Sequence, residues 1–425
     1  MLLIKNGRII NPQSNQDEIT DILIIDEIIK DIGKDLPFAA NTEIIDAEGM
    51  IVAPGLVDIH VHFRDPGFTY KEDIESGAKA AAKGGYTTVV MMANTNPPID
   101  NIETLKYVLN KGNKTGINIM TCAAVTQGLK GVETVDMAAL KEAGAIGFTD
   151  DGIPLLDEEI VKSALKEAAK IGLPISFHEE NPSYIRNNGI NEGYASEQLG
   201  IYGSSREAEI VMIKRDLALA KEAGAKVVIQ HISTKEGVAL VRQAKADNVA
   251  IFAEAAPHHF TLTEEAVIKK GALAKMNPPL RTEEDRIAVI EGLKDGTIDV
   301  IATDHAPHSK EEKERDIKAA PSGIIGLETA LSLGIRELVN KGYLTISELI
   351  ERMSSNPAKL YELPAGNIMI GKSADLVIFD PSVMWVAEEF TSKSQNSPFI
   401  GEKMPGAIHY TICKGKVVWH SVTVS

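Results

Sequence analysis

Residues 57–62 read VDIHVH, a short apolar run that is rich in β-branched residues and ends in a histidine. Seven further apolar runs follow it, separated by helical patterns such as EEIVKSALKEAAKIG, at 87–94, 118–125, 145–151, 174–180, 226–232, 250–259 and 299–308. Continuous apolar runs are typical of parallel strands that are buried on both faces. Eight strand and helix units in about 250 residues predict an α/β fold, the (β/α)8 TIM barrel.

An open doubly wound sheet is the alternative fold for such a pattern. Its fingerprint, Gly-x-Gly-x-x-Gly after a strand, follows none of the eight runs. The barrel is therefore the favoured architecture.

The two ends of the chain show alternating strand patterns instead. LLIKNGRII and DILIIDEIIKDIG lie near the start, and ADLVIFDP and HYTICKGKVVWH lie near the end. Because a small sheet is only marginally stable alone, we expect both ends to join in one small β-sandwich subdomain. The predicted boundaries are 1–53 and 364–425 for this subdomain and 54–363 for the barrel.

The composition excludes several classes of function. Among 425 residues, 44 Lys and Arg oppose 60 Asp and Glu, so the net charge of −16 would repel the phosphates of nucleic acid. The chain does not open with a signal sequence, and no run approaches the ~18 apolar residues of a membrane span, so we expect a cytoplasmic protein. Cys122 and Cys413 lie in apolar runs and are expected to be buried free thiols.

Histidine and aspartate interrupt the apolar runs at their C-terminal ends, in five of the eight units. The residues are His60, His62, Asp150, Asp151, His178, His231, Asp304 and His305. These ends form the catalytic face of a barrel. Since side chains alternate along a strand, both histidines of the HVH motif project to the same side.

Imidazole and carboxylate are the groups that hold Zn²⁺ or a similar divalent ion. Each residue alone has a plainer explanation, because a strand-end histidine often only packs and an aspartate often caps the next helix. Together, however, so many desolvated polar groups in one barrel mouth would be costly without a cation. Six ligands favour two metal ions over one.

The motifs also carry a family resemblance, which extends through nearly the whole chain. The matching stretches are PGLVDIHVHFRDPG at 54–67, MMANTNPP at 91–98, GFTDDG at 147–152, FHEE at 177–180, QHIS at 230–233, APHHF at 256–260, KMNPPLR at 275–281, IATDHAPH at 301–308 and GLETAL at 326–331. The sequence resembles the amidohydrolase superfamily and, within it, the bacterial type I dihydroorotases.

The resemblance implies which residues hold the metals. His60, His62 and Asp304 would bind one zinc ion, and His178 and His231 would bind the second. In many binuclear relatives a carboxylated lysine bridges the ions, but residues 143–152 contain no lysine. Type I dihydroorotases resemble this chain in placing an aspartate there, so we expect Asp151 to bridge the ions, with Asp150 as the alternative.

The implied reaction is the reversible cyclisation of N-carbamoyl-L-aspartate to L-dihydroorotate in de novo pyrimidine biosynthesis. A hydroxide that bridges two zinc ions has a lowered pKa and is the expected nucleophile. Asp304 would be the general acid/base, which accepts the proton of the hydroxide and passes it to the departing amide nitrogen.

A set of residues around the metals is expected to bind the substrate. Arg64 resembles the carboxylate clamp of the family, since a guanidinium binds a carboxylate in bidentate fashion. The predicted set is His62, Phe63, Arg64, Asn94, Asn277, His308, Ser322 and Gly323. The alternatives are an arginine ion pair at the barrel rim and asparagines that serve the turns before the prolines.

Residues 309–323, SKEEKERDIKAAPSG, are strongly charged. They form either a solvated surface loop or a mobile lid over the site, in which Ser322 and Gly323 would offer backbone groups to the substrate. The family often has an apolar residue at the position of Ser322, which leaves the role of its side chain open. His258 and His259 are assigned to structural support around the metal ligands.

Two rival functions follow from the same pattern. One is a hydantoinase, dihydropyrimidinase or allantoinase, which the missing lysine and Arg64 disfavour. The other is a catalytically inactive barrel kept as a binding partner, which the six intact ligand positions disfavour. The resemblance further implies a homodimer and, in some members, association with aspartate transcarbamoylase.

Overall fold

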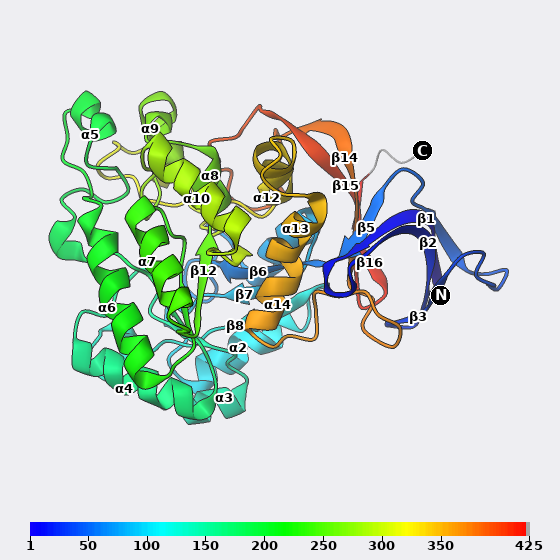
Figure 1. Ribbon diagram of the computed structural model, residues 1–425, viewed down its shortest axis with the longest axis horizontal. Coiled ribbons are helices and arrows are strands. Elements are labelled where there is room, and N and C mark those ends of the chain that lie inside the picture. The colour runs from blue at the N-terminus through cyan, green and yellow to red at the C-terminus, as the bar shows by residue number, and fades with distance from the viewer. Residues whose placement is uncertain (422–425) are drawn as a thin grey trace.

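Parallel strands with helices around them make up the larger part of the molecule, and a curved sheet forms the rest (Figure 1). The structure is a computed structural model and describes residues 1–421. The alternation of strands and helices agrees with the α/β class predicted from the sequence.

The parallel strands form two sheets that continue each other. The first contains β6 (Leu56–Val61), β7 (Tyr86–Met91) and β8 (Asn118–Thr121). The second contains β9 (Phe148–Thr149), β10 (Ile175–Phe177), β11 (Val227–Ile229), β12 (Ile251–Ala255) and β13 (Val300–Ile301). Parallel bridges from Ala123 to Phe148 and from Val61 to His305 join the sheets at both edges. The eight strands therefore follow one another in chain order around a closed path.

Helices follow the strands and lie outside them. They are α1 (Ile74–Lys83), α2 (Ile102–Gly112), α3 (Met137–Ala143), α4 (Glu158–Ile171), α5 (Tyr194–Leu199), α6 (Glu207–Ala223), α7 (Lys235–Ala246), α8 (Pro257–Thr261), α9 (Glu265–Lys270), α10 (Glu283–Asp295), α11 (Lys310–Lys313), α12 (Ala330–Gly334), α13 (Ile346–Ile350) and α14 (Asn356–Leu360). Short 3-10 turns lie at η1 (Pro12–Ser14), η2 (Gln127–Leu129), η3 (Pro182–Tyr184) and η4 (Gly271–Ala274), and π-helical turns at η5 (Ile335–Val339) and η6 (Glu351–Ser355).

Local sequence sets where these helices begin and end. The side chain of Asp157 accepts hydrogen bonds from the amides of Glu159 and Ile160, which caps the start of α4. The helix ends at Gly172, whose φ of 76° lies in the left-handed region that glycine adopts without strain. Because α4 ends at this glycine, only a short connection leads from the helix to the next strand, β10.

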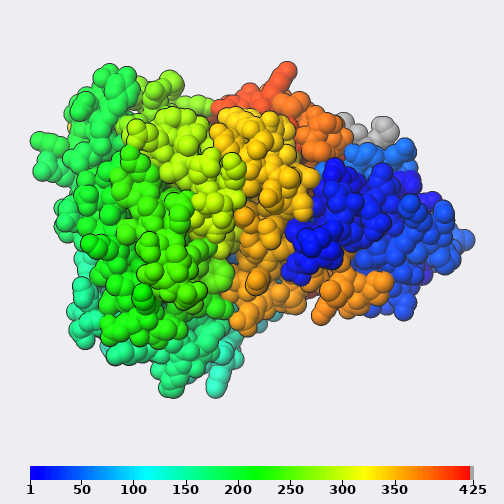
Figure 2. All heavy atoms as spheres, viewed as in Figure 1, coloured from blue at the N-terminus to red at the C-terminus, as the bar shows by residue number. Residues whose placement is uncertain are grey.

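Both ends of the chain join in one eight-stranded sheet. Its strands are β1 (Leu2–Asn11), β2 (Gln16–Ile25), β3 (Ile28–Gly33), β4 (Glu43–Asp46), β5 (Ile51–Pro54), β14 (Leu376–Val386), β15 (Lys403–Cys413) and β16 (Lys416–His420). β5 pairs with β14 in antiparallel register, with Val52 opposite Ile378. Figure 2 shows the N-terminal residues in blue and C-terminal residues in orange at the same end of the molecule.

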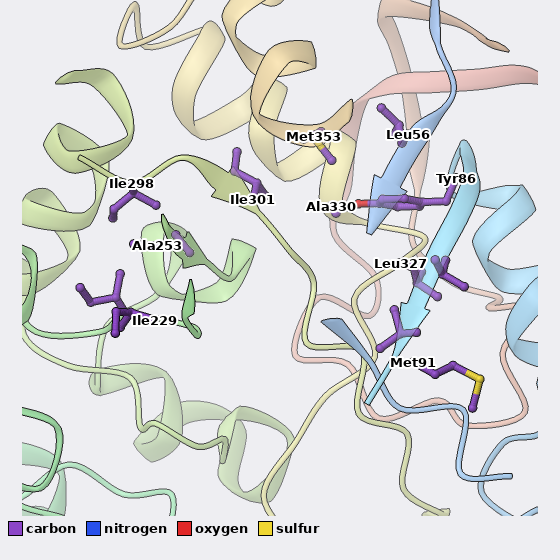
Figure 3. Close-up of a cluster of buried hydrophobic side chains, with 14 of the residues drawn as sticks. Leu56, Tyr86, Met91, Ile229, Ala253, Ile298, Ile301, Leu327, Ala330 and Met353 are labelled. Atoms are coloured by element: carbon purple, nitrogen blue, oxygen red, sulfur yellow. The ribbon is translucent and has the colours of Figure 1, made fainter. Parts of the chain in front are cut away.

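Buried apolar side chains form three clusters, one of which, around Val57, lies among the parallel strands. The other two differ in size. The larger runs between the parallel strands and their helices and includes Leu56, Tyr86, Ile229 and Ile301 (Figure 3). A separate cluster of isoleucine and leucine side chains lies in the terminal sheet. Burial of this apolar surface is the main source of the stability of the fold.

Two expectations about composition agree with the structure. Cys122 and Cys413 are buried and are not joined in a disulfide. Within residues 1–421, no helix has the length and apolar character needed to cross a membrane.

Candidate metal centre

The C-terminal ends of the strands bring imidazoles and carboxylates to one place. His60 and His62 lie at the end of β6, and the amide of His62 donates to the carbonyl of His305 after β13. The other members, which follow four further strands of the closed path, are Asp151, His178, His231 and Asp304. All six residues are buried. Positions far apart in the sequence thus share one site.

The ligand atoms form two groups that have one member in common. His60, His62 and Asp151 make the first group, and Asp151, His178 and His231 make the second. Within each group the ligand atoms lie within 4.8 Å of one another. Asp151 therefore stands where a bridging carboxylate would hold two ions.

The two carboxylate oxygens of Asp151 face the imidazoles. Oδ1 lies 3.4 Å from Nε2 of His60, 3.5 Å from Nδ1 of His178 and 3.7 Å from Nε2 of His231. Oδ2 lies 3.5 Å from Nε2 of His62. Each imidazole offers one nitrogen to the same centre.

Asp304 lies beside the first group. Its Oδ1 is 3.1 Å from Nε2 of His62 and 3.6 Å from Nε2 of His60. Its φ is 49°, and those of His231 and Arg64 are 31° and 57°, so three residues of the site occupy the left-handed region that non-glycine residues rarely adopt. Such backbone conformations persist where the surrounding structure holds them, which is common at functional sites.

Asp150 points to a different part of the molecule. Its carboxylate accepts hydrogen bonds from the amides of Val125 and Thr126 and from the hydroxyl of Thr126. Burial raises the pKa of Asp150 to about 6. Of the two adjacent aspartates, only Asp151 reaches the imidazoles.

The centre contains polar atoms that need a partner. Nε2 of His60 and Oδ1 of Asp151 are buried and make no hydrogen bond within the described chain. Burying such atoms unpaired is costly, and both point to the place where the ligand groups meet. Each group contains two imidazoles and the carboxylate of Asp151, and such ligands suit divalent ions. The residues present therefore fit a metal pair.

The ionisation of the centre shows how strongly its carboxylates attract positive charge. Burial lowers the pKa of His178, but the nearby carboxylates of Asp151 and Glu180 outweigh it and raise the pKa to about 10. Burial likewise lowers the pKa of His60, yet the neighbouring Glu254 and Asp151 carry it well above its ordinary value. In turn, these imidazoles hold the pKa of Asp151 well below its usual range against the effect of burial.

Three groups behind the ligands fix the orientation of the imidazoles. Nδ1 of His60 lies 2.5 Å from Oε1 of Glu254, and Nε2 of His178 lies 3.0 Å from Oε2 of Glu180. Nδ1 of His62 lies 2.9 Å from Oδ1 of Asn94. Partners of this kind set which nitrogen is free to bind a metal.

Glu254 and Glu180 are not among the site residues predicted from the sequence. Glu254 stands inside the apolar run of β12, where a charged residue is rare enough to have served as a signal. Glu180 follows His178 by two positions, which places it on the same side of an extended chain.

A cavity of about 190 Å³ opens over the ligands. From the predicted substrate-binding set, its wall includes His62, Arg64, Asn94, Asn277, His308, Ser322 and Gly323. Larger hollows lie elsewhere, such as one of about 620 Å³ beside α2, but its lining contains none of the metal-ligand candidates. The small cavity is the one that faces the centre.

Phe63 lies away from this cavity. Its side chain is fully buried in the apolar core and packs against Gly77. The centroid of its ring lies 6.2 Å from the centroid of the His305 ring. Since successive side chains alternate along an extended chain, Phe63 faces away from His62, the residue before it. The side chain of Phe63 is therefore not part of the cavity wall.

Asn94 has its amide group committed to the metal ligands. Besides the contact with His62, its Nδ2 donates to Oδ2 and to the carbonyl of Asp151, at 3.2 and 3.3 Å. By contrast, Oδ1 of Asn277 and Oγ of Ser322 are buried in the cavity wall without a partner among the described residues. These two atoms are free to pair with a ligand.

Residues 309–323 are anchored over the cavity by two lysines. Nζ of Lys313 donates to the carbonyls of Pro321 and Gly323, and Nζ of Lys275 donates to those of Ile317 and Ala320. The segment also contains the short helix α11. Nε2 of His259, on α8, donates to the carbonyl of Pro278 at 3.0 Å and so supports the turn that carries Asn277.

Comparisons with known proteins bear on this site. The model of the amidohydrolase family matches residues 51–418. The chain is 56% identical to a curated dihydroorotase of Clostridioides difficile over 421 residues, which is 99% of this chain and 100% of the relative. It is 51% identical to the dihydroorotase of Clostridium acetobutylicum, over 99% of both chains.

The solved structures that share this fold include hydantoinases. The L-hydantoinase (dihydropyrimidinase) of Arthrobacter aurescens is 28% identical in sequence. Its structure superposes with a TM-score of 0.88, and the match covers 99% of this chain and 96% of that one. A D-hydantoinase of Thermus sp. is 26% identical, with a TM-score of 0.86 and the same coverage.

Proposed function

Because the chain belongs to the amidohydrolase family and is related over its full length to dihydroorotases, we propose that it is a metal-dependent dihydroorotase. It interconverts N-carbamoyl-L-aspartate and L-dihydroorotate by closing and opening a cyclic amide. The observation that carries this function is the 56% identity to a dihydroorotase over the whole chain. The hydantoinases share the fold at about half that identity.

The architecture proposed for this function is a (β/α)8 barrel, residues 54–363, beside a β-sandwich subdomain with predicted bounds 1–53 and 364–425, whose strands up to residue 421 belong to one eight-stranded sheet. The two bridges that join the parallel sheets support the closed barrel. The pairing of β5 with β14 supports the shared terminal subdomain.

The metal pair is proposed to be zinc, with two ions per subunit. His60, His62 and Asp304 would hold one ion, His178 and His231 the other, and Asp151 both. When bound, such ions lower the pKa of a water molecule and polarise the carbonyl under attack. The shared membership of Asp151 in both ligand groups supports the count of two.

Asp304 is the proposed general acid/base. Its carboxylate forms part of the cavity wall next to His62, where an attacking water would lie. In ring opening, Asp304 accepts the proton of this water and passes it to the departing ring nitrogen. In ring closure the proton moves in the opposite direction.

The cavity wall supplies the groups that bind the substrate. The guanidinium of Arg64 lines the cavity, and only its Nε is engaged within residues 1–421, at 3.3 Å from the carbonyl of Pro307. The remaining N–H groups suit the substrate carboxylate. The unpaired Oδ1 of Asn277 and Oγ of Ser322 suit the ring amides, and Gly323 and His308 complete the wall.

The experiment that tests the function is ring opening of dihydroorotate by the purified protein, before and after treatment with a chelator. We expect activity that is lost on chelation and restored by zinc. Turnover of hydantoins without turnover of dihydroorotate would support a hydantoinase instead. No turnover with any divalent metal would support an inactive barrel.

Assembly and location are further proposals from the family. We expect a cytoplasmic homodimer, with association to aspartate transcarbamoylase as an additional arrangement. Sedimentation of the protein alone, and then mixed with that transcarbamoylase, tests both.

A further inference from the structure

The connection between β14 and β15 extends from the terminal sheet to the cavity over the metal centre. It contains Asn396, which is 3% exposed although it belongs to no helix or strand. The motifs that point to the metal centre do not include this segment. Its contacts involve the two loops that form one side of the cavity.

The side chain of Asn396 joins these loops directly. Its Nδ2 donates to the carbonyls of Ala306, at 3.1 Å, and Gly323, at 3.0 Å. Its Oδ1 accepts the amide of His308 at 3.1 Å. Its own carbonyl accepts the amide of Ile325 at 3.0 Å. All the hydrogen-bonding groups of the side chain are thus committed to loop backbone.

The loops joined in this way carry the wall of the cavity. Ala306 and His308 follow Asp304, while Ser322 and Gly323 end the segment that Lys313 anchors. Nε2 of His308 lies 2.8 Å from the carbonyl of Ser322, so the two loops also touch each other. A change in their spacing would move the groups proposed to bind substrate without displacing the imidazoles of His60, His178 and His231.

Buried carboxylates hold the other part of the same segment. Glu328 accepts the amides of Thr391 and Ser392, and Glu72 accepts the hydroxyl of Ser392 and the amide of Lys393. Glu72 also lies 3.4 Å from Nε2 of His305. The segment is therefore fixed before it reaches Asn396, so the amide group presents its donors in a defined place.

We infer that Asn396 is a positioning residue for substrate binding, which clamps the Ala306–His308 loop to Gly323 and so sets the width of the cavity. This inference rests on the proposed dihydroorotase function. The chemistry of an amide suits the role, because two N–H donors meet two carbonyls and one oxygen meets an N–H. A carboxylate in its place would direct an oxygen at two carbonyl oxygens.

The test compares Asn396→Asp with Ser397→Ala in the full-length, metal-loaded enzyme. Ser397 is the neighbouring residue, 1% exposed, and its hydroxyl contacts only the amide of Phe399 within the described chain. For Asn396→Asp we expect KM for dihydroorotate to rise about tenfold or more, with kcat within about threefold and the metal content unchanged. Ser397→Ala should keep the KM of the natural enzyme.

Three results would overturn the clamp: a KM of Asn396→Asp within about twofold of the natural enzyme, an equal loss of kcat and kcat/KM, or the same KM shift in Ser397→Ala. If Asn396→Asp fails to fold, hydrogen exchange on the natural protein decides. The amides of His308 and Ile325 should then be protected, and exchange as fast as at the exposed residues 314–316 would refute the clamp.

The two proposals fail in different ways. If the natural protein does not open dihydroorotate, the proposed function fails, while the exchange experiment still tests the clamp. If the natural protein opens dihydroorotate and Asn396→Asp has the same KM, only the proposal for Asn396 fails.

Discussion

Nδ1 of His60 lies 2.5 Å from Oε1 of Glu254, and both side chains are almost fully buried. This contact leaves Nε2 of His60 free to face Asp151. The carboxylate that orients the imidazole belongs to β12 and lies 194 residues further along the chain.

The first prediction concerns this contact. Glu254→Gln removes the negative charge behind His60, so the imidazole becomes a weaker ligand, and we expect metal affinity to fall about 10- to 100-fold. Competition with a chromogenic chelator measures the change. Glu264→Gln is the matched control, because Glu264 is also buried but accepts hydrogen bonds from Asn191 and Ala195 instead. Equal metal affinity in both variants would contradict the role of Glu254.

The second prediction separates the two adjacent aspartates. Asp151→Asn should lose the metal ions and about 1000-fold or more of kcat, since the shared ligand is gone. Asp150→Asn should retain the metal and most activity, because its carboxylate meets only Val125 and Thr126. Elemental analysis and steady-state assays distinguish them. Metal retained in Asp151→Asn and lost in Asp150→Asn would reverse the assignment.

Removal of the metal is predicted to lower thermal stability. A ligand that binds only the folded state raises Tm, so a chelator should reduce the Tm of the natural protein and added zinc should restore it. Asp151→Asn should show little response to either treatment. A Tm that does not change on chelation of the natural protein would argue against a bound metal.

A fourth prediction concerns the backbone at Gly323. Its φ is 124°, and an added Cβ would lie 2.8 Å from Cβ of Ala306 and 3.2 Å from Nε2 of His308. Gly323→Ala should therefore raise KM about tenfold, because the cavity wall must shift. Gly342→Ala is the control, since Gly342 has a φ of 74° but no atom within 4 Å of an added Cβ. A KM that moves equally in both would assign the effect to general backbone strain.

The last prediction uses pH. Burial, and then the charge of Lys275, lower the pKa of Lys313 to about 7. The folded state therefore loses the proton of Lys313 at lower pH than the unfolded state, so this group makes the protein more stable as the pH rises from about 7 to about 10. Below about pH 7 Lys313 is charged in both the folded and the unfolded state, so its contribution to the free energy of unfolding no longer changes with pH.

Lys313→Met removes this titration. In urea unfolding at pH 7 and pH 10, the natural protein should gain stability relative to Lys313→Met at the higher pH. A constant difference between the two proteins across this interval would show that Lys313 titrates normally.

Much of the fold could be predicted because its signals are local. The apolar run 57–62, the helical period of 158–171 and the glycine at 172 each act over a few residues. Polar residues at strand ends predicted where the site would lie, since all parallel strands present the same ends to one face. The HVH motif needs only the alternation of a strand to direct two imidazoles together.

Other features depended on contacts between distant parts of the chain. The family resemblance favoured Asp151 and left Asp150 as the alternative, and residue pattern alone gives no reason for the choice, because the carboxylate of Asp150 is held by the distant Val125 and Thr126. Residue pattern also missed Glu254, and it missed Asn396, whose partners lie 73 to 90 residues away.

The sequence by itself thus determined the order of strands and helices, the residue types of the centre and the face on which they gather. Only the tertiary structure decided which carboxylate faces the imidazoles, which groups orient them and what fixes the cavity wall. The physical reason is that periodicity and capping are properties of neighbouring residues, whereas the direction of a buried polar side chain is set by the partner that satisfies its hydrogen bonds.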